Sequence, residues 1–153
     1  MTATIFISFD HDDNAQVNGF RGLIENPNHP LDAHDRSLRE PVRDARGNPI
    51  KVRPGDPRAE PIKRELRSRF DRCSRLVVLV GDNTHSSEWV NWEILTFYDM
   101  KYPLSGDRTW KRIRGMWLKG ATGGLPAALQ NGKSTRALAW DPTALDRWFD
   151  EPI

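Results

Sequence analysis

Residues 86–93 place two carboxylates, two tryptophans and two serines within eight positions, in the order Ser-Ser-Glu-Trp-Val-Asn-Trp-Glu. They follow residues 76–80, Leu-Val-Val-Leu-Val, an apolar run typical of a strand that is buried on both faces of a parallel sheet. Ser86 or Ser87 can cap a helix, and Glu88 in its first turn suits the helix dipole. The order is therefore strand, loop and helix, and ligands bind at such junctions in open α/β sheets.

Trp89 and Glu93 are four positions apart, so a helix would present them on one face near this junction. An aromatic surface beside a carboxylate suits a nucleotide or a sugar. On spacing alone, an ordinary solvated helix residue is the favoured interpretation of Glu93. A catalytic role for this carboxylate needs support from the rest of the chain.

A second candidate strand, residues 4–9, reads Thr-Ile-Phe-Ile-Ser-Phe and is expected to be central in the sheet. Phe9 and Asp10 stand at its carboxyl end, where a ligand would bind. The Asp-Asp-Asn of residues 12–14 is equally compatible with capping the next helix.

Periodicity and turn residues predict the other elements of an α/β fold. Strands are expected at 31–35, 111–118 and 135–140, and helices at 15–25, 57–72, 126–129 and 142–149. The alternation of strands and helices predicts a parallel sheet with helices on both faces.

Residues 36–56 form a long polar segment that contains three prolines and two glycines. A loop of about twenty residues is long for a compact domain and often has a function or is mobile. We predict that it is mobile without ligand. Closure over a pocket and an ordinary surface excursion are both open interpretations.

Composition favours a compact protein without charged macromolecular partners. Charged residues make up 29% of the 153 residues and the net charge is +2, without a basic block that would indicate nucleic acid. No apolar run indicates a membrane span. The lone Cys73 excludes a disulfide framework and fits a reducing cytoplasm. The four histidines lack a zinc-like spacing, so no metal is expected: His11, His29, His34 and His85.

Several motifs together resemble one family. Residues 5–10, Ile-Phe-Ile-Ser-Phe-Asp, resemble the opening strand of Toll/interleukin-1 receptor (TIR) domains. Residues 89–93 are similar to the W-C-x-x-E motif of catalytic TIR domains, with valine in place of the cysteine. Residues 87–94 match the pattern Ser-x-Trp-Val-x-Trp-Glu-Ile of a bacterial TIR-like subfamily that includes the signal-producing component of Thoeris anti-phage systems.

This resemblance implies a flavodoxin-like, TIR-like three-layer α/β sandwich with a five-stranded parallel sheet in the order 2-1-3-4-5. Residues 1–153 would form a single TIR-like domain, with 36–56 in the variable region around the family's BB loop. It implies an NAD nucleosidase or ADP-ribosyl cyclase-like enzyme whose glutamate is Glu93. NAD would be the substrate and no cofactor would be needed. Self-association is implied too, and a cyclic or conjugated ADP-ribose would act as a diffusible messenger on a partner effector protein.

The chemistry of this reaction needs few groups. Nicotinamide leaves a cationic substrate as a neutral molecule, so one carboxylate that stabilises the oxocarbenium-like ribose can suffice. Aromatic rings can stack on the substrate, and hydroxyls or a helix start can bind ribose or phosphate. The side chains expected to contact substrate are those at the two strand ends: Ser8, Phe9, Asp10, Asn83, Ser87 and Trp89.

Two other functions remain open. The same fold could serve as a non-catalytic TIR-like interaction module. It could also be a receiver-like phosphoacceptor, because Asp10, Asp12, Asp13 and Asp82 follow strands, although no lysine follows the last strand.

Overall fold

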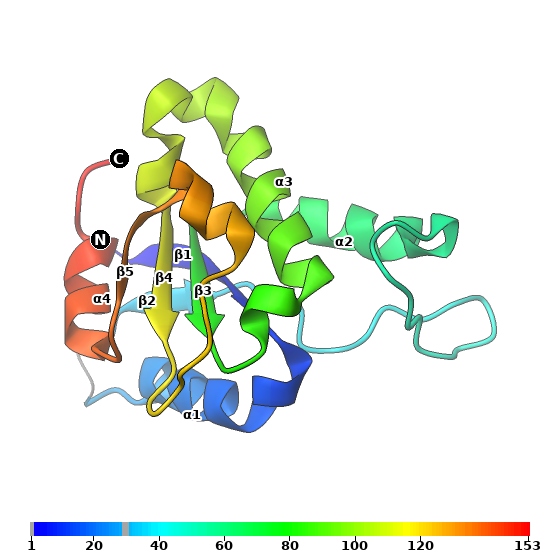
Figure 1. Ribbon diagram of the computed structural model, residues 1–153, viewed down its shortest axis with the longest axis horizontal. Coiled ribbons are helices and arrows are strands. Elements are labelled where there is room, and N and C mark those ends of the chain that lie inside the picture. Colours follow the sequence, from blue (N-terminus) through cyan, green and yellow to red (C-terminus); the bar gives the residue numbers. More distant parts are fainter. Residues whose placement is uncertain (1, 29–30) are drawn as a thin grey trace.

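The computed structural model describes residues 2–28 and 31–153. Its centre is one all-parallel sheet in the order β2-β1-β3-β4-β5 (Figure 1). The strands are β1 (Ala3–Phe9), β2 (Ala33–Asp35), β3 (Arg75–Val80), β4 (Ile113–Trp117) and β5 (Thr135–Leu138). This order confirms the predicted fold class, and the two apolar runs are the two neighbouring inner strands β1 and β3.

Helices cover both faces of the sheet. They are α1 (Asn14–Glu25), α2 (Glu60–Asp71), α3 (Glu88–Ser105) and α4 (Pro142–Phe149). Short helical turns connect them at His11–Asp13, Pro57–Ala59, Thr84–Ser86, Gly106–Arg112 and Leu129–Lys133.

Two separate cores show which helices cover which face. On one face, Val17 and Phe20 of α1 and Trp148 of α4 pack with Ile5 and Ile7 of β1. On the other face, α2 and α3 pack against the alternate strand residues, among them Phe6 of β1 and Val78 of β3. The result is the predicted three-layer sandwich (Figure 1).

Several predicted bounds differ from those of the structure. The strand predicted at 31–35 shortens to its last three residues, and the one predicted at 135–140 ends at Leu138 after an irregular pairing with β4. Residues 106–112 form a helical turn, so β4 starts two residues later than predicted. The short helix predicted at 126–129 starts at residue 127 and continues as a π-helical turn. Gly132, with φ +76°, reverses the chain there.

Within residues 2–28 and 31–153, no helix is long and apolar enough to cross a membrane.

Candidate functional site

Glu93 lies where the start of α3 faces the carboxyl half of β1. Ser87 caps α3 by accepting a hydrogen bond from the backbone N–H of Val90 at 3.3 Å. Val90 and Ile94 are fully buried against the sheet. Position 93 falls within this buried stripe, one turn after Val90. Ser8, on β1, donates a hydrogen bond from its Oγ to Glu93 Oε1 at 2.8 Å.

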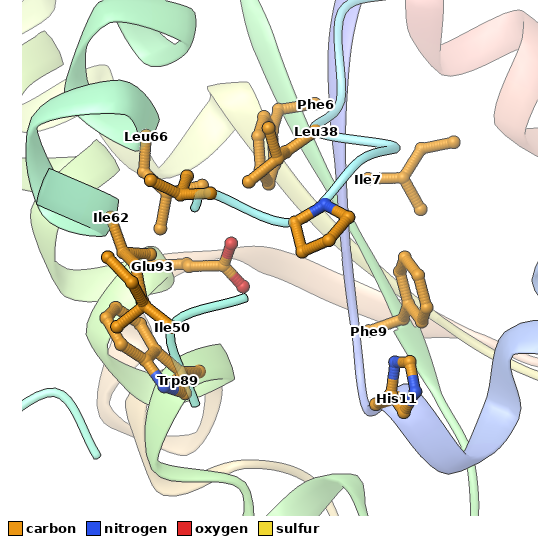
Figure 2. Close-up of a pocket in the computed structure, with 12 residues that line it drawn as sticks. Phe6, Ile7, Phe9, His11, Leu38, Ile50, Ile62, Leu66, Trp89 and Glu93 are labelled. Carbon is orange, nitrogen blue, oxygen red and sulfur yellow. The ribbon is translucent and has the colours of Figure 1, made fainter. Parts of the chain in front are cut away.

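The Glu93 carboxyl is buried, which contradicts the expectation of a solvated helix residue. The residue is 8% exposed. Burial raises the pKa of Glu93 to about 8, and the hydrogen bond from Ser8 offsets this shift only in part. Within the described ranges Oε2 has no hydrogen-bond partner. The carboxyl end of the side chain points into a cavity (Figure 2).

The cavity has a volume of about 300 Å³ and mainly apolar walls (Figure 2). This volume is at the lower end of the range for small-molecule sites. Its walls come from β1, the turn after it, residues 36–56, α2 and α3. The lining residues are Phe6, Ile7, Phe9, His11, Leu38, Pro41, Val42, Ile50, Ile62, Leu66, Trp89 and Glu93.

Residues 36–56 supply one wall because a hairpin-like turn orders them. The Ile50 N–H donates to the Val42 carbonyl at 2.9 Å, and the Asp44 N–H donates to the Asn48 carbonyl at 2.8 Å. Gly47 turns the chain with φ +82°, a conformation that favours glycine. The turn thereby brings Val42 and Ile50 to the same cavity.

Both ends of this segment are tied to the sandwich. At its start, the backbone N–H of Ile7 donates to Ser37 Oγ at 2.7 Å. Near its end, Trp89 Nε1 donates to the Val52 carbonyl at 2.9 Å. Arg53 forms a two-pronged ion pair with Glu88, with a distance of 3.0 Å between Arg53 Nε and Glu88 Oε2. The first turn of α3 therefore holds the end of the segment.

Four of the residues predicted from the sequence come together here. Phe9, Trp89 and Glu93 line the cavity, and Ser8 lies behind the carboxyl that it contacts. The Trp89 indole ring also packs edge-on against Trp92, at 5.6 Å between centroids. One carboxyl and two aromatic side chains thus face a common space, as the sequence predicts.

Three other predicted contact residues lie outside the lining of this cavity. Asp10 accepts a hydrogen bond from the N–H of Asp12 at 2.9 Å and caps the turn His11–Asp13. Asp13 stands at the start of α1 but makes no side-chain cap bond, so of the two interpretations left open for residues 12–14, capping of α1 is not made by Asp13. Ser87 caps α3, and Asn83 is exposed in the preceding loop. Their expected roles in binding substrate stay predictions.

The sequence-based prediction missed the outer part of the site. His11, which the sequence offers no reason to place in the site, is exposed and yet lines the cavity beside Phe9 (Figure 2). Leu38, Val42, Ile50 and Val52 are the larger apolar side chains within a polar segment, and the first three line the cavity. That pattern was the available signal that the segment covers an apolar space.

No group of metal-binding side chains accompanies the cavity. The described residues contain no cluster of three or more histidine, cysteine, aspartate or glutamate side chains that could hold a metal ion. His29 lies outside the described residues.

Comparisons with known proteins agree with this architecture. The structure is similar to that of a 2-deoxyribosyltransferase from the psychrotolerant bacterium Bacillus psychrosaccharolyticus, with a TM-score of 0.51 and 15% identity. The similarity covers 94% of this chain and 90% of the other, and at this identity it shows the fold alone. No curated protein matches the sequence. The family model for the TIR-like domain of the Thoeris protein ThsB matches residues 6–114, from β1 into β4. Because this match spans most of the chain and includes Glu93, the protein belongs to the ThsB TIR-like domain family.

Proposed function

We propose that this protein cleaves the bond between nicotinamide and ribose in NAD, and that Glu93 stabilises the ribose cation that forms. One observation carries the proposal: a buried carboxyl points into a largely apolar cavity with aromatic walls at the carboxyl edge of the sheet. A carboxylate in a site from which water is excluded acts more strongly on a developing positive charge than one in solvent.

The proposed reaction is a heterolytic cleavage. The C1′–N bond breaks, its electron pair stays on the pyridine nitrogen, and nicotinamide leaves as a neutral ring. The positive charge moves to the ribose, where an ionised Glu93 stabilises it. Phe9 and Trp89 offer aromatic faces or edges to the leaving ring, and Ser8 holds the carboxyl in place.

A nucleophile then completes the reaction at C1′. Water gives ADP-ribose and a proton, whereas a nitrogen of the substrate's own adenine gives a cyclic product. A cyclic or conjugated ADP-ribose could serve as a messenger to a partner effector in anti-phage defence.

The direct test is incubation of the purified protein with NAD, followed by mass spectrometry of the products. We expect nicotinamide to appear in a one-to-one ratio with ADP-ribose or its cyclic or conjugated form. Intact NAD after long incubation at high protein concentration would contradict the proposal.

A non-catalytic interaction module is the second candidate function. It is favoured by apolar side chains that α3 exposes to solvent, with Leu104 75%, Tyr102 47% and Leu95 44% exposed. Intact NAD together with concentration-dependent self-association would favour this function over catalysis.

A further inference from the structure

The cavity contains one acidic group without a positive partner. Ten of its twelve lining residues are neither acidic nor basic, and His11 at the mouth is the other titratable one. The Glu93 carboxyl accepts a hydrogen bond from Ser8 on β1, whose hydroxyl is neutral. Glu93 is therefore buried beside aromatic and aliphatic side chains, and no described cation offsets its charge.

Lysine and arginine side chains on the described neighbouring elements stay outside the lining of the cavity. On α2, Lys63 and Arg67 lie over the ring of Trp92, at 5.8 and 5.5 Å from its centroid, and neither lines the cavity. On residues 36–56 and the start of α3, Arg53 and Glu88 neutralise each other. No lysine or arginine is among the described residues that line the cavity, so none of them pairs with the carboxyl. Arg21 lies over the ring of Phe9, 5.3 Å from its centroid, and its Nε donates to Asp35.

A buried carboxyl in this environment favours its neutral form, because ionisation would leave an unpaired charge in an apolar site. An opposite charge about 4–6 Å away reverses this preference. The aromatic rings of Phe6 and Trp89 favour a cation too, because the face of an aromatic ring attracts positive charge, whereas Arg21 already lies over the ring of Phe9. A flat organic cation satisfies the carboxyl and the rings at once.

We propose that this cavity selects positively charged N-substituted pyridine rings over neutral ones, and that binding the cation expels the proton of Glu93 to solvent. The proton balance is simple: the neutral Glu93 carboxyl and a free cation become a carboxylate–cation pair and one released proton. The inference rests on the proposed function, which makes a nicotinamide ring the expected occupant. Beyond that function, the inference states that the cavity recognises the positive charge of the ring.

Two consequences follow for the reaction cycle. Oxidised NAD carries a pyridinium ring, whereas the reduced ring of NADH is neutral, so the cavity should bind the oxidised form more tightly than the reduced form. After cleavage, the nicotinamide ring is neutral as well. It loses the attraction of Glu93 at the moment it becomes product, which promotes its release.

The test compares two small ligands that cannot be cleaved at a ribose bond. 1-Methylnicotinamide carries the positive ring, and nicotinamide is its neutral counterpart. Isothermal titration calorimetry at pH 7, in two buffers with different ionisation enthalpies, measures both the affinity and the number of protons released. We expect 1-methylnicotinamide to bind at least about tenfold more tightly at pH 7 and to release most of one proton, because a pKa of about 8 that falls by about two units on binding produces both effects.

The matched variants are Glu93→Gln and Asp99→Asn. Asp99 is exposed on the same helix, so its variant should keep both the preference and the proton release. Glu93→Gln should lose both. Two results measured on the parent protein would overturn the inference: equal affinities for the two ligands, or tight binding of the cation without proton release. These measurements decide the question even if the Glu93→Gln variant fails to fold. Absence of binding at millimolar 1-methylnicotinamide would overturn it as well.

This experiment is independent of NAD cleavage. If the cation binds with proton release and NAD stays intact, the proposed function fails and the recognition of a cationic ring stands. If NAD is cleaved and the protein binds 1-methylnicotinamide and nicotinamide equally, the proposed function stands and the recognition of a cationic ring fails.

Discussion

Glu93 combines burial, a single hydrogen bond and an orientation toward the cavity, so its charge should matter most in the transition state. Glu93→Gln keeps the size of the side chain and a hydrogen-bonding oxygen near Ser8, but it removes the charge. We expect kcat for NAD cleavage to fall roughly 10²–10³-fold, as for other electrostatic groups in active sites. The change in KM should be smaller, near tenfold, because the ribose cation forms only during reaction.

Steady-state kinetics with NAD checks this prediction, and Asp99→Asn serves as the control. Glu88→Gln is unsuitable as an inert control, because Glu88 holds Arg53. An unchanged kcat in a folded Glu93→Gln protein would remove Glu93 from the mechanism.

The raised pKa of Glu93 also predicts the pH dependence of activity. The free protein holds this carboxyl neutral below about pH 8, because burial raises its pKa to about 8. If cleavage needs the ionised form, kcat/KM should increase about tenfold per pH unit up to pH 8 and then level off, since this ratio reports the free enzyme. The kcat profile should be displaced to lower pH, because the bound pyridinium lowers the pKa of Glu93. Identical profiles for kcat and kcat/KM would contradict this coupling.

The raised pKa of Glu93 should also make the stability of the protein depend on pH, in the absence of any substrate. In the folded protein the pKa of Glu93 is about 8, against an ordinary value of 4.5, so the folded state holds a proton that the unfolded state releases. The contribution of the neutral Glu93 carboxyl to the free energy of unfolding is fully present below about pH 4.5 and is lost as the pH rises through 8. Glu93→Gln lacks it, so its melting temperature relative to the parent should rise between pH 5 and pH 8.5. Thermal denaturation at pH 5, 7 and 8.5 measures the difference, and a difference that is independent of pH would contradict the assignment.

At the scale of residues, the sequence was sufficient to predict that Trp89 and Glu93 lie on one helix face, where both line the cavity, and insufficient to judge their surroundings. Burial of Glu93 follows from its place in the stripe that contains Val90 and Ile94, a periodic signal that was present in the sequence. The role of Asp10 as a cap depended on how the loop after β1 turns. A cluster of Asp and Asn residues does not specify which of them caps the turn.

Among the elements, residues 36–56 shape the site by building one wall of the cavity. Breaking their tie to α3 with Arg53→Ala should loosen the wall and leave the cores intact, since Arg53 is exposed and outside both. We expect affinity for 1-methylnicotinamide to weaken several-fold and amide exchange at Ile50 to accelerate. Calorimetry and hydrogen–deuterium exchange would measure these changes.

The control for this variant is Arg58→Ala, which removes an ion pair with Asp56 that stays within one turn. Arg53→Ala and Glu88→Gln break the same pair, so their effects on affinity should not add in the double variant. Additive effects would mean that the pair does not hold the wall.

Amide exchange in the free parent protein also tests the predicted mobility of residues 36–56. Slow exchange throughout this segment would contradict that prediction.

Elements with a strong periodic or apolar pattern could be predicted, and those formed by tertiary contacts could not. β3 and α3 follow from an uninterrupted apolar run and a capped helix. The hairpin-like turn at Gly47 depends on backbone bonds between residues that have no regular pattern. The hydrogen bond from Trp89 to the Val52 carbonyl joins residues that are 37 positions apart, which local propensity cannot indicate.

For the whole molecule, the alternation of strands and helices was enough to give the layers, and the family resemblance gave the strand order. β1 lies between β2 and β3, so the chain crosses from one side of β1 to the other after β2 (Figure 1). Crevices open at the carboxyl ends of strands where the order of an α/β sheet reverses in this way. Phe9 and Glu93 line a cavity at this place, so the position of the site follows from topology.

The size of the cavity leads to a prediction about assembly. A volume of about 300 Å³ suits a nicotinamide ring with part of its ribose, so the rest of a dinucleotide must lie outside it. We expect a second copy of the chain to complete the binding surface, as the resemblance to TIR enzymes implies. The rate of NAD cleavage should then rise faster than linearly with protein concentration, in parallel with the oligomeric fraction measured by light scattering. A rate strictly proportional to concentration in a protein that stays monomeric would show that one chain suffices, and the remainder of NAD would then have to bind beside residues 50–54 of the same chain.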